Sequence, residues 1–283
     1  MRTRNATVAL VFAAVVLFAG AARAGRNGSP QLIRSAIAAN SVDAIQAELE
    51  HAEYLVCAAC TDLVLPLVDH SDYRVRKVAA WWLSRRATGR QVFVSMLGRL
   101  SQPDSAKAAN AADVLGEFGS RAAIPALSAA LSNPIFDGAA RAAMARALGA
   151  IGRPDGAAAL VTALGAPEPP VKSAALIALR ELGTFYGKGA AEAEPLLSDA
   201  DAGVRAQAAL TLGAARAPAG VASLLRALAG DASVDVRKRA AWALGEMGAP
   251  VAQAGEGLSR AASGDASPVV RSIAEIAIGK LTR

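Results

Sequence analysis

Cys57 and Cys60 are the only cysteines of this 283-residue chain, and a C-x-x-C spacing can serve several kinds of chemistry. A c-type haem site would have a histidine directly after the second cysteine, where this chain has Thr61. Thioredoxin-like redox chemistry needs the motif at a strand-to-helix junction, and no strand–helix–strand pattern surrounds it. If the chain is exported, the pair favours a disulfide across one helical turn, with two reduced packing cysteines as the alternative.

The remaining polar residues do not form a recognisable reaction centre. His51 and His70 are the only histidines, and no set of metal ligands with suitable spacing accompanies them. The sequence contains no Ser/His/Asp order, no glycine-rich phosphate loop and no carboxylate pair that stands out from the repeats described below. We therefore expect no catalytic, metal-binding or cofactor-binding residues and no cofactor, which favours a binding protein over an enzyme.

The first 24 residues predict a secretory signal peptide. Arg2 and Arg4 precede an uncharged apolar run over residues 6–22, and Ala22-Arg23-Ala24 places small residues at the cleavage positions. We expect cleavage after Ala24; a retained membrane anchor is the alternative, at the short edge of a span of about 20 residues. Removal of three arginines and no acidic residue lowers the net charge from +6 to +3, which disfavours a nucleic-acid partner.

Seven segments share one frame: an apolar residue, a basic residue, two variable residues, two small residues, two variable residues and a closing apolar residue, often followed by glycine. The closing residues recur every 31 to 34 positions, at Leu83, Leu115, Leu148, Leu179, Leu212, Leu244 and Ile278. A second apolar stretch lies between successive frames, so each unit predicts two antiparallel helices. With 53% apolar and 19% charged residues, the chain can bury the large core that such units need.

Helix boundaries are marked in most units. Three residues before each frame stand Asp72, Asp104, Asp137, Glu168, Asp201, Ser233 and Ser267, of which all but Glu168 are favoured N-caps. Glycines suited to a left-handed helix stop follow four frames, at Gly119, Gly152, Gly183 and Gly248. The chain thus predicts an all-α protein: a signal peptide (1–24), a linker with N-terminal capping helices (25–54) and an α-solenoid of about seven helical pairs (55–283).

The motif Asp-x-x-Val-Arg-x-x-Ala-Ala-x-x-Leu-Gly, clearest from Asp201 to Gly213, resembles short HEAT repeats of the phycobilisome-lyase-like kind. The resemblance extends from about Leu55 to Leu281. It implies that the Val-Arg helices line the concave side of a superhelix and that their basic residues pair with capping acids in a ladder. The implied ladder residues are Arg76, Arg141, Lys172, Arg205, Arg237 and Arg271. Because Ala108 replaces the basic residue in the second unit, we expect an interruption there.

Candidates for partner binding occupy the sixth position after the first frame residue, about 240° around the helix from it. This row contains Trp81, Asp113, Arg146, Ile177, Leu210, Trp242 and Ile276. Its members either wedge between neighbouring helices, which we favour, or form an apolar groove on the concave side. Trp81 and Trp242 are the best contact candidates because tryptophan dominates interface hot spots. Further candidates are Lys77, Lys238 and Arg239 on the same helices, and Phe185 and Tyr186 on an inserted loop.

Taken together, these patterns predict an exported scaffold, periplasmic or secreted, whose concave face binds another protein. We expect a monomer or a partner-dependent complex, no nucleic-acid partner and no stable membrane insertion after signal cleavage. The alternative is an enzyme or enzyme subunit: the family resemblance includes bilin-lyase-like factors that attach chromophores.

Overall fold

The computed structural model describes residues 28–183, 190–248 and 252–281. The predicted signal peptide and the contact candidates Phe185 and Tyr186 lie outside these ranges. All regular elements in the described ranges are α-helices or short 3-10 helices, which confirms the all-α prediction. No helix among them combines the length and the apolar character that crossing a membrane requires.

The helices follow one another in pairs, an initial capping pair and then seven repeat pairs. The capping pair is α1 (Pro30–Ala38) and α2 (Val42–His51). The repeat pairs are α3 (Ala58–Val64) with α4 (Tyr73–Ser84), α5 (Gly89–Arg99) with α6 (Ser105–Phe118), α7 (Ile124–Ser132) with α8 (Gly138–Ile151), α9 (Ala157–Ala163) with α10 (Pro169–Gly183), α11 (Ala190–Ala193) with α12 (Ala202–Ala214), α13 (Val221–Gly230) with α14 (Val234–Met247), and α15 (Ala252–Gly264) with α16 (Pro268–Leu281).

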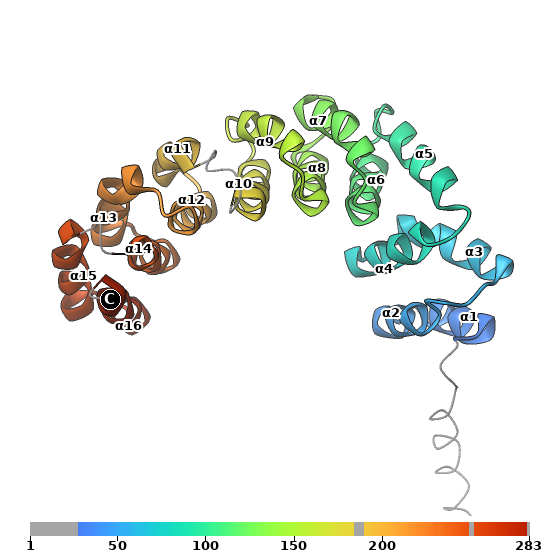
Figure 1. Cartoon of the computed structure of the whole chain (residues 1–283), viewed down its shortest axis with the longest axis horizontal. Helices are drawn as coiled ribbons and strands as arrows, with labels where there is room; N and C mark the ends of the chain where they lie inside the picture. The colour runs from blue at the N-terminus through green and yellow to red at the C-terminus, as the bar shows by residue number, and fades with distance from the viewer. Residues whose placement is uncertain (1–27, 184–189, 249–251, 282–283) are drawn as a thin grey trace, which may run out of the picture.

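Five short 3-10 helices adjoin the outer helices. Two follow α3 and α11, namely η1 (Leu65–Asp69) and η4 (Glu194–Ser198), and three precede α7, α9 and α13, namely η2 (Arg121–Ala123), η3 (Pro154–Gly156) and η5 (Pro218–Gly220). The stack curves into an open arch, with the even-numbered helices from α2 to α16 on its inner side and the odd-numbered helices from α3 to α15 on its outer side (Figure 1). The even-numbered repeat helices are the Val-Arg helices, so these line the concave face as the resemblance implied.

Capping by aspartates follows the sequence pattern, whereas one predicted serine cap and one predicted glycine stop differ from it. The side chains of Asp72, Asp104, Asp137 and Asp201 accept backbone N–H groups in the first turns of their helices. Ser233 occupies an N-cap position but makes no such bond. Gly119, Gly152 and Gly248 have positive φ at their helix ends. The prediction for Gly183 was wrong: it is the last residue of α10, where glycine adopts the right-handed conformation that any residue tolerates.

Small residues set the distance between inner helices. At four seams the glycine that follows the closing frame residue faces an alanine of the next inner helix so closely that a Cβ atom would overlap it. An added Cβ would lie 3.0 Å from the Ala147 Cα at Gly116, 3.0 Å from the Ala178 Cα at Gly149, 2.6 Å from the Ala243 Cα at Gly213 and 2.8 Å from the Ala277 Cα at Gly245. We call these four contacts, α6–α8, α8–α10, α12–α14 and α14–α16, the tight seams.

Two other seams lack this glycine–alanine pair. In the α4–α6 seam the equivalent positions hold Ser84 and Val114, and in the α10–α12 seam they hold Arg180 and Thr211. Thr211 uses its hydroxyl to bond the backbone oxygens of Gln207 and, across the seam, Leu176. The inner helices pack less extensively at these two contacts, which we call the wide seams.

Candidate binding surface on the concave face

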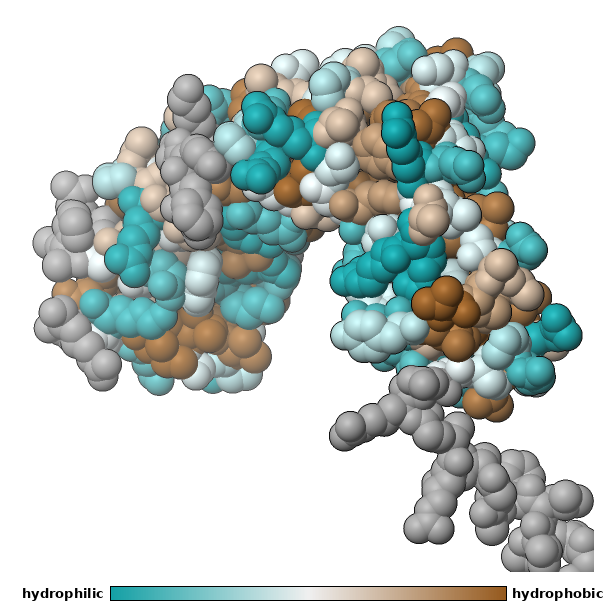
Figure 2. All heavy atoms as spheres, turned by 45° about the vertical axis from the view of Figure 1, so that its right-hand side comes forward, coloured by the Kyte–Doolittle hydropathy of each residue, from teal (hydrophilic) through white to brown (hydrophobic). Residues whose placement is uncertain are grey.

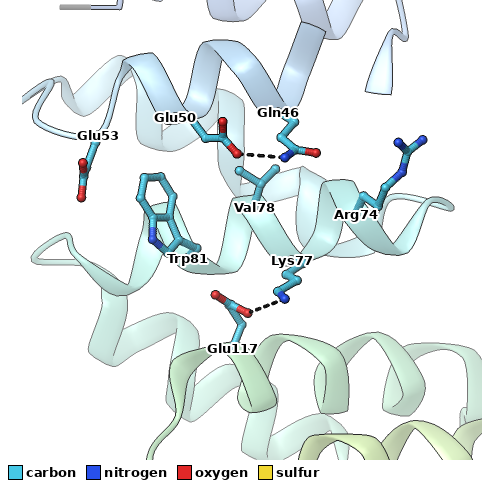
Figure 3. A pocket seen from close by; sticks show the side chains of 8 residues that line it. All are labelled: Gln46, Glu50, Glu53, Arg74, Lys77, Val78, Trp81 and Glu117. Carbon is cyan, nitrogen blue, oxygen red and sulfur yellow. Dashed lines mark hydrogen bonds and ion pairs between the residues drawn. The ribbon is translucent and has the colours of Figure 1, made fainter. Parts of the chain in front are cut away.

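We call α1 to α6 the N-terminal arm of the arch. A hollow of about 660 Å³ opens on its inner side, between α2, α4 and α6. Val78 and Trp81 of α4 form its apolar part (Figure 3). Polar and charged side chains surround them: Gln46, Glu50, Glu53, Arg74, Lys77 and Glu117. We call this space the Trp81 hollow. It adjoins the wide α4–α6 seam, since Trp81 and Lys77 come from one side of that seam and Glu117 from the other.

A second hollow, of about 630 Å³, continues along the inner face from α4 across α6 and α8 to α10. Its lining includes Tyr73, Arg146, Ile177 and Glu181, and it shares Lys77 and Glu117 with the first. The two hollows therefore form one groove along the inner face. Figure 2 shows the arch open between its arms, with hydrophilic side chains on the inner edges of both.

Glu117 lies where the two hollows meet. Its carboxylate oxygen is 3.8 Å from the Lys77 Nζ, and its side chain is 22% exposed. Burial raises the pKa of Glu117 above its usual value, and the charges of Lys77 and Arg85 oppose this effect only in part. The carboxylate is thus poorly compensated.

Trp81 is held from one side by Arg85, whose guanidinium carbon lies 4.5 Å from the centre of the indole ring. Arg85 also lies 3.7 Å from the Glu53 carboxylate and donates a hydrogen bond to the Trp81 carbonyl oxygen. Trp81 remains half-buried and lines the hollow. Together with Arg85 and Glu53, it forms a fixed aromatic wall with charged groups at its edge.

Trp242 occupies the same frame position in α14 but has different surroundings. An added Cβ at Gly213 of α12 would lie 2.9 Å from its indole ring, so the ring packs on a tight seam. The nearby candidates Lys238 and Arg239 both pair with Asp235, at 2.7 Å and 2.8 Å. The sixth-position row therefore divides: Trp81 faces a hollow, Trp242 packs between helices, Asp113 is buried and Ile276 is exposed.

The basic residues of the frame do form a ladder, but its acids differ from those expected. The main partners are Asp199 for Lys172, Asp231 for Arg205 and Asp265 for Arg237, at 2.6, 2.7 and 2.8 Å. These acids stand two residues before the capping position of the next unit, and each also accepts the backbone N–H of that capping residue, which is Asp201, Ser233 or Ser267. Arg141 is the exception, since its partner Glu168 stands at the capping position. Arg271, in the last unit, donates to the carbonyls of Asp265 and Ala266 and has no ion pair within the described ranges.

The ladder also departs from this pattern around the second unit, where Ala108 supplies no basic side chain. Arg76 has no loop acid ahead of it and instead donates to the carboxylate of Asp113, within α6, at 2.6 Å. Arg146 of α8 approaches the other oxygen of the same carboxylate at 3.6 Å. The side chain of Asp113 is only 2% exposed. One buried carboxylate thus connects three successive inner helices.

The cysteines and histidines lie away from the groove's apolar wall. Cys57 is the N-cap residue of α3, and the structure joins it to Cys60 in a disulfide with the Cα atoms 5.2 Å apart. His70 faces the Asn40 amide oxygen and accepts the backbone N–H of Asp72. The described residues contain no group of side chains that could hold a metal ion.

Sequence reasoning missed the acids of the groove. Glu117 and Glu181 occupy the tenth position of their frames, about 40° around the helix from the sixth position. Extending the search from the sixth to the tenth position would have found both. Glu50 and Glu53 belong to the capping pair, outside the repeat frame, so no periodic signal marks them.

Similarity to known proteins supports the fold. A family model for HEAT repeats matches residues 94–180 and 190–279. The YibA protein of Escherichia coli is 17% identical, over 89% of this chain and 92% of its own, with a TM-score of 0.56. A chain of the CpcE–CpcF complex of phycocyanin lyase from Nostoc is 24% identical, over 78% of this chain and 94% of its own, with a TM-score of 0.43.

No curated protein sequence matches the chain. The likeness to YibA shows a shared fold, and the phycocyanin lyase likeness, at its lower TM-score, carries no argument about activity. The HEAT-repeat match begins at residue 94, so the capping pair and the first repeat pair, which contain most of the Trp81 hollow, lie outside it. Because the two matched stretches cover more than half of the chain, we conclude that this protein belongs to the HEAT-repeat family.

Proposed function

We propose that this protein is an exported scaffold that holds another protein on the concave face of its solenoid. The observation that carries the proposal is the groove formed by the two adjoining hollows, which share Lys77 and Glu117. The groove crosses five inner helices, α2 to α10, and so offers an extended surface of the kind that repeat proteins use for partners.

The composition of the groove suits a protein partner. Tyr73, Trp81 and Ile177 provide apolar contact area, and charged side chains lie between them. Protein interfaces typically combine a few aromatic anchors with a polar surround. Trp81 and Lys77 are therefore the proposed primary contacts. Trp242, Lys238 and Arg239 are proposed secondary contacts on the opposite arm, and Phe185 and Tyr186 remain candidates from the sequence.

Site-specific photocrosslinking tests the concave face directly. A photoreactive amino acid is placed at Tyr73 or Ile177 in the groove. As controls, the same amino acid is placed at Val94 or Ile135, which are exposed positions away from the groove. We expect the groove positions to crosslink the same protein in cells, with the yield strongly reduced by Trp81→Ala. Equal crosslinking of that protein from Val94 or Ile135, unaffected by Trp81→Ala, would contradict the proposal.

Export forms the second part of the proposal and rests on residues 1–24, with their basic start, apolar run and small residues before Gly25. Intact mass measurement of the protein isolated without reductant tests it. We expect a mature N-terminus at Gly25 and no alkylation of Cys57 or Cys60 before reduction, because an oxidising compartment preserves a disulfide. Retention of residues 1–24 in the membrane fraction would contradict cleavage, and two alkylated cysteines would contradict the disulfide.

A further inference from the structure

The Trp81 hollow has more negative charge than its own basic side chains neutralise. Arg74 is engaged by Asp43 and Asp72, at 3.1 and 3.4 Å. Arg85 lies beside Glu53, and Lys77 lies beside Glu117. Each basic residue around the hollow thus already has an acidic partner.

The acids are not all matched in return. Glu50 accepts a hydrogen bond from the Gln46 amide at 2.9 Å, and among the described residues no basic group lies within ion-pair distance of it (Figure 3). Further along the groove, Arg146 is directed to Asp113, whereas Glu181 has no ion pair within the described ranges. After internal pairing, the unmatched charge of the groove is therefore negative.

The geometry of the hollow adds an apolar component. Figure 3 places Trp81 between Glu50 of α2 and Glu53, which follows α2, on one side and Glu117 of α6 on the other. An aromatic wall beside carboxylates complements a long basic side chain, because the methylene groups can lie on the ring while the charged end reaches the acids. The poorly compensated carboxylate of Glu117 would be stabilised by an added cation. A partner carboxylate would meet like charge, and a purely apolar side chain would leave the acids unpaired.

We propose that the Trp81 hollow receives a lysine or arginine side chain of the partner protein, held between Glu50 and Glu117 against Trp81. The inference rests on the proposed function and specifies the partner's chemistry at this one position. Under this proposal, the N-terminal arm recognises a basic side chain of the partner, and the remainder of the groove supplies contact area.

A small probe tests the site without the partner. The mature protein is labelled with 5-fluorotryptophan, and its three tryptophan signals are assigned with Trp→Phe variants. The probes are N-acetyl-lysine amide and N-acetyl-norleucine amide, which has a similar chain without the charge. We expect the lysine probe alone to shift the Trp81 signal, with Trp82 and Trp242 unaffected.

Substitutions of the acids sharpen the test. Glu50→Gln and Glu117→Gln should each weaken binding of the lysine probe about five- to tenfold, which corresponds to the loss of one charge-assisted contact. Glu246→Gln is the matched control, since Glu246 is an inner-face glutamate that pairs with Lys280 on the opposite arm. An equal response to the norleucine probe, or a lysine response unchanged in the Glu50→Gln/Glu117→Gln variant, would overturn the inference.

The probe experiment can fail independently of the crosslinking experiment that tests the proposed function. If groove crosslinking persists but the lysine probe neither binds nor reduces the crosslink, the scaffold function stands and the cation site is wrong. If the lysine probe binds as expected but crosslinking shows no preference for the groove, the hollow is a cation site and the concave-face scaffold is wrong.

Discussion

The wide and tight seams of the inner face show how one repeat frame builds two kinds of surface. In the tight seams, glycine and alanine bring successive helices into backbone contact, as at Gly213 and Ala243. In the wide α4–α6 seam, Ser84 and Val114 take their places, and the Trp81 hollow lies beside it. The fold tolerates the larger residues because each repeat contacts only its neighbours. At the α4–α6 seam, the departure from the frame therefore lies beside a part of the candidate site that no tight seam borders, whereas the second hollow runs over the tight α6–α8 and α8–α10 seams.

The largest expected effect separates the two adjacent tryptophans of the N-terminal arm. Trp82 is fully buried, and its Nε1 donates to the Ala52 carbonyl at 3.0 Å, whereas Trp81 lines the hollow. Trp82→Ala should lower the free energy of unfolding by about 3 to 5 kcal/mol, as for other buried aromatic truncations. Trp81→Ala should cost clearly less. Urea unfolding of both variants measures the difference, and equal losses would show that Trp81 belongs to the core.

The next effect tests the tight seams themselves. Gly213→Ala places a Cβ 2.6 Å from the Ala243 Cα, so α12 and α14 must separate, and we expect a loss of about 1 to 3 kcal/mol. Gly98→Ala is the control, because Gly98 is exposed near the end of α5 and has nothing within 4 Å of the added Cβ. That change should be neutral or stabilise by up to about 1 kcal/mol. If thermal unfolding shows the same shift for both variants, close approach does not define the tight seams.

The smallest expected effect is a difference in pH dependence between the ladder and the hollow. The hydrogen bond from Arg205 lowers the pKa of Asp231, and that from Arg237 lowers the pKa of Asp265. Their stabilisation is complete above the unfolded-state pKa of about 3.9 and is lost as pH falls through the lower folded pKa values. Burial raises the pKa of Glu117, so its contribution has the opposite sign and stability falls as pH rises from about 4.3 to the folded pKa.

Unfolding midpoints measured across this acid range show in which direction pH changes the stability contributed by the ladder and by Glu117. Asp231→Asn should reduce the acid-dependent loss of stability, since it removes a carboxylate that must be protonated. Glu117→Gln should instead slightly raise stability near neutral pH, because it removes a poorly compensated charge. A ladder variant and a hollow variant that respond to pH in the same direction would contradict the assigned electrostatics.

The repeat frame was sufficient to predict the pairing of helices and most caps, because each depends on residues within one unit. The inner position of the Val-Arg helices was implied by the family resemblance. It did not predict the acids that partner Arg205 and Arg237. Those acids, Asp231 and Asp265, precede the capping serines of the next unit by two residues. They lie outside the frame, so the spacing within a single frame does not mark them. The Trp81 hollow escaped prediction for the same reason, since Glu50 and Glu117 come from two other helices.

Asp113 couples two successive seams of the inner face, so that they do not open independently. Its buried carboxylate bonds Arg76 on the helix before it and approaches Arg146 on the helix after it. Opening either seam breaks a contact and leaves the shared charge less compensated at the other. The N-terminal arm is therefore tied to the body of the stack and resists fraying one repeat at a time. In amide hydrogen exchange, α4, α6 and α8 should open as a single cooperative unit.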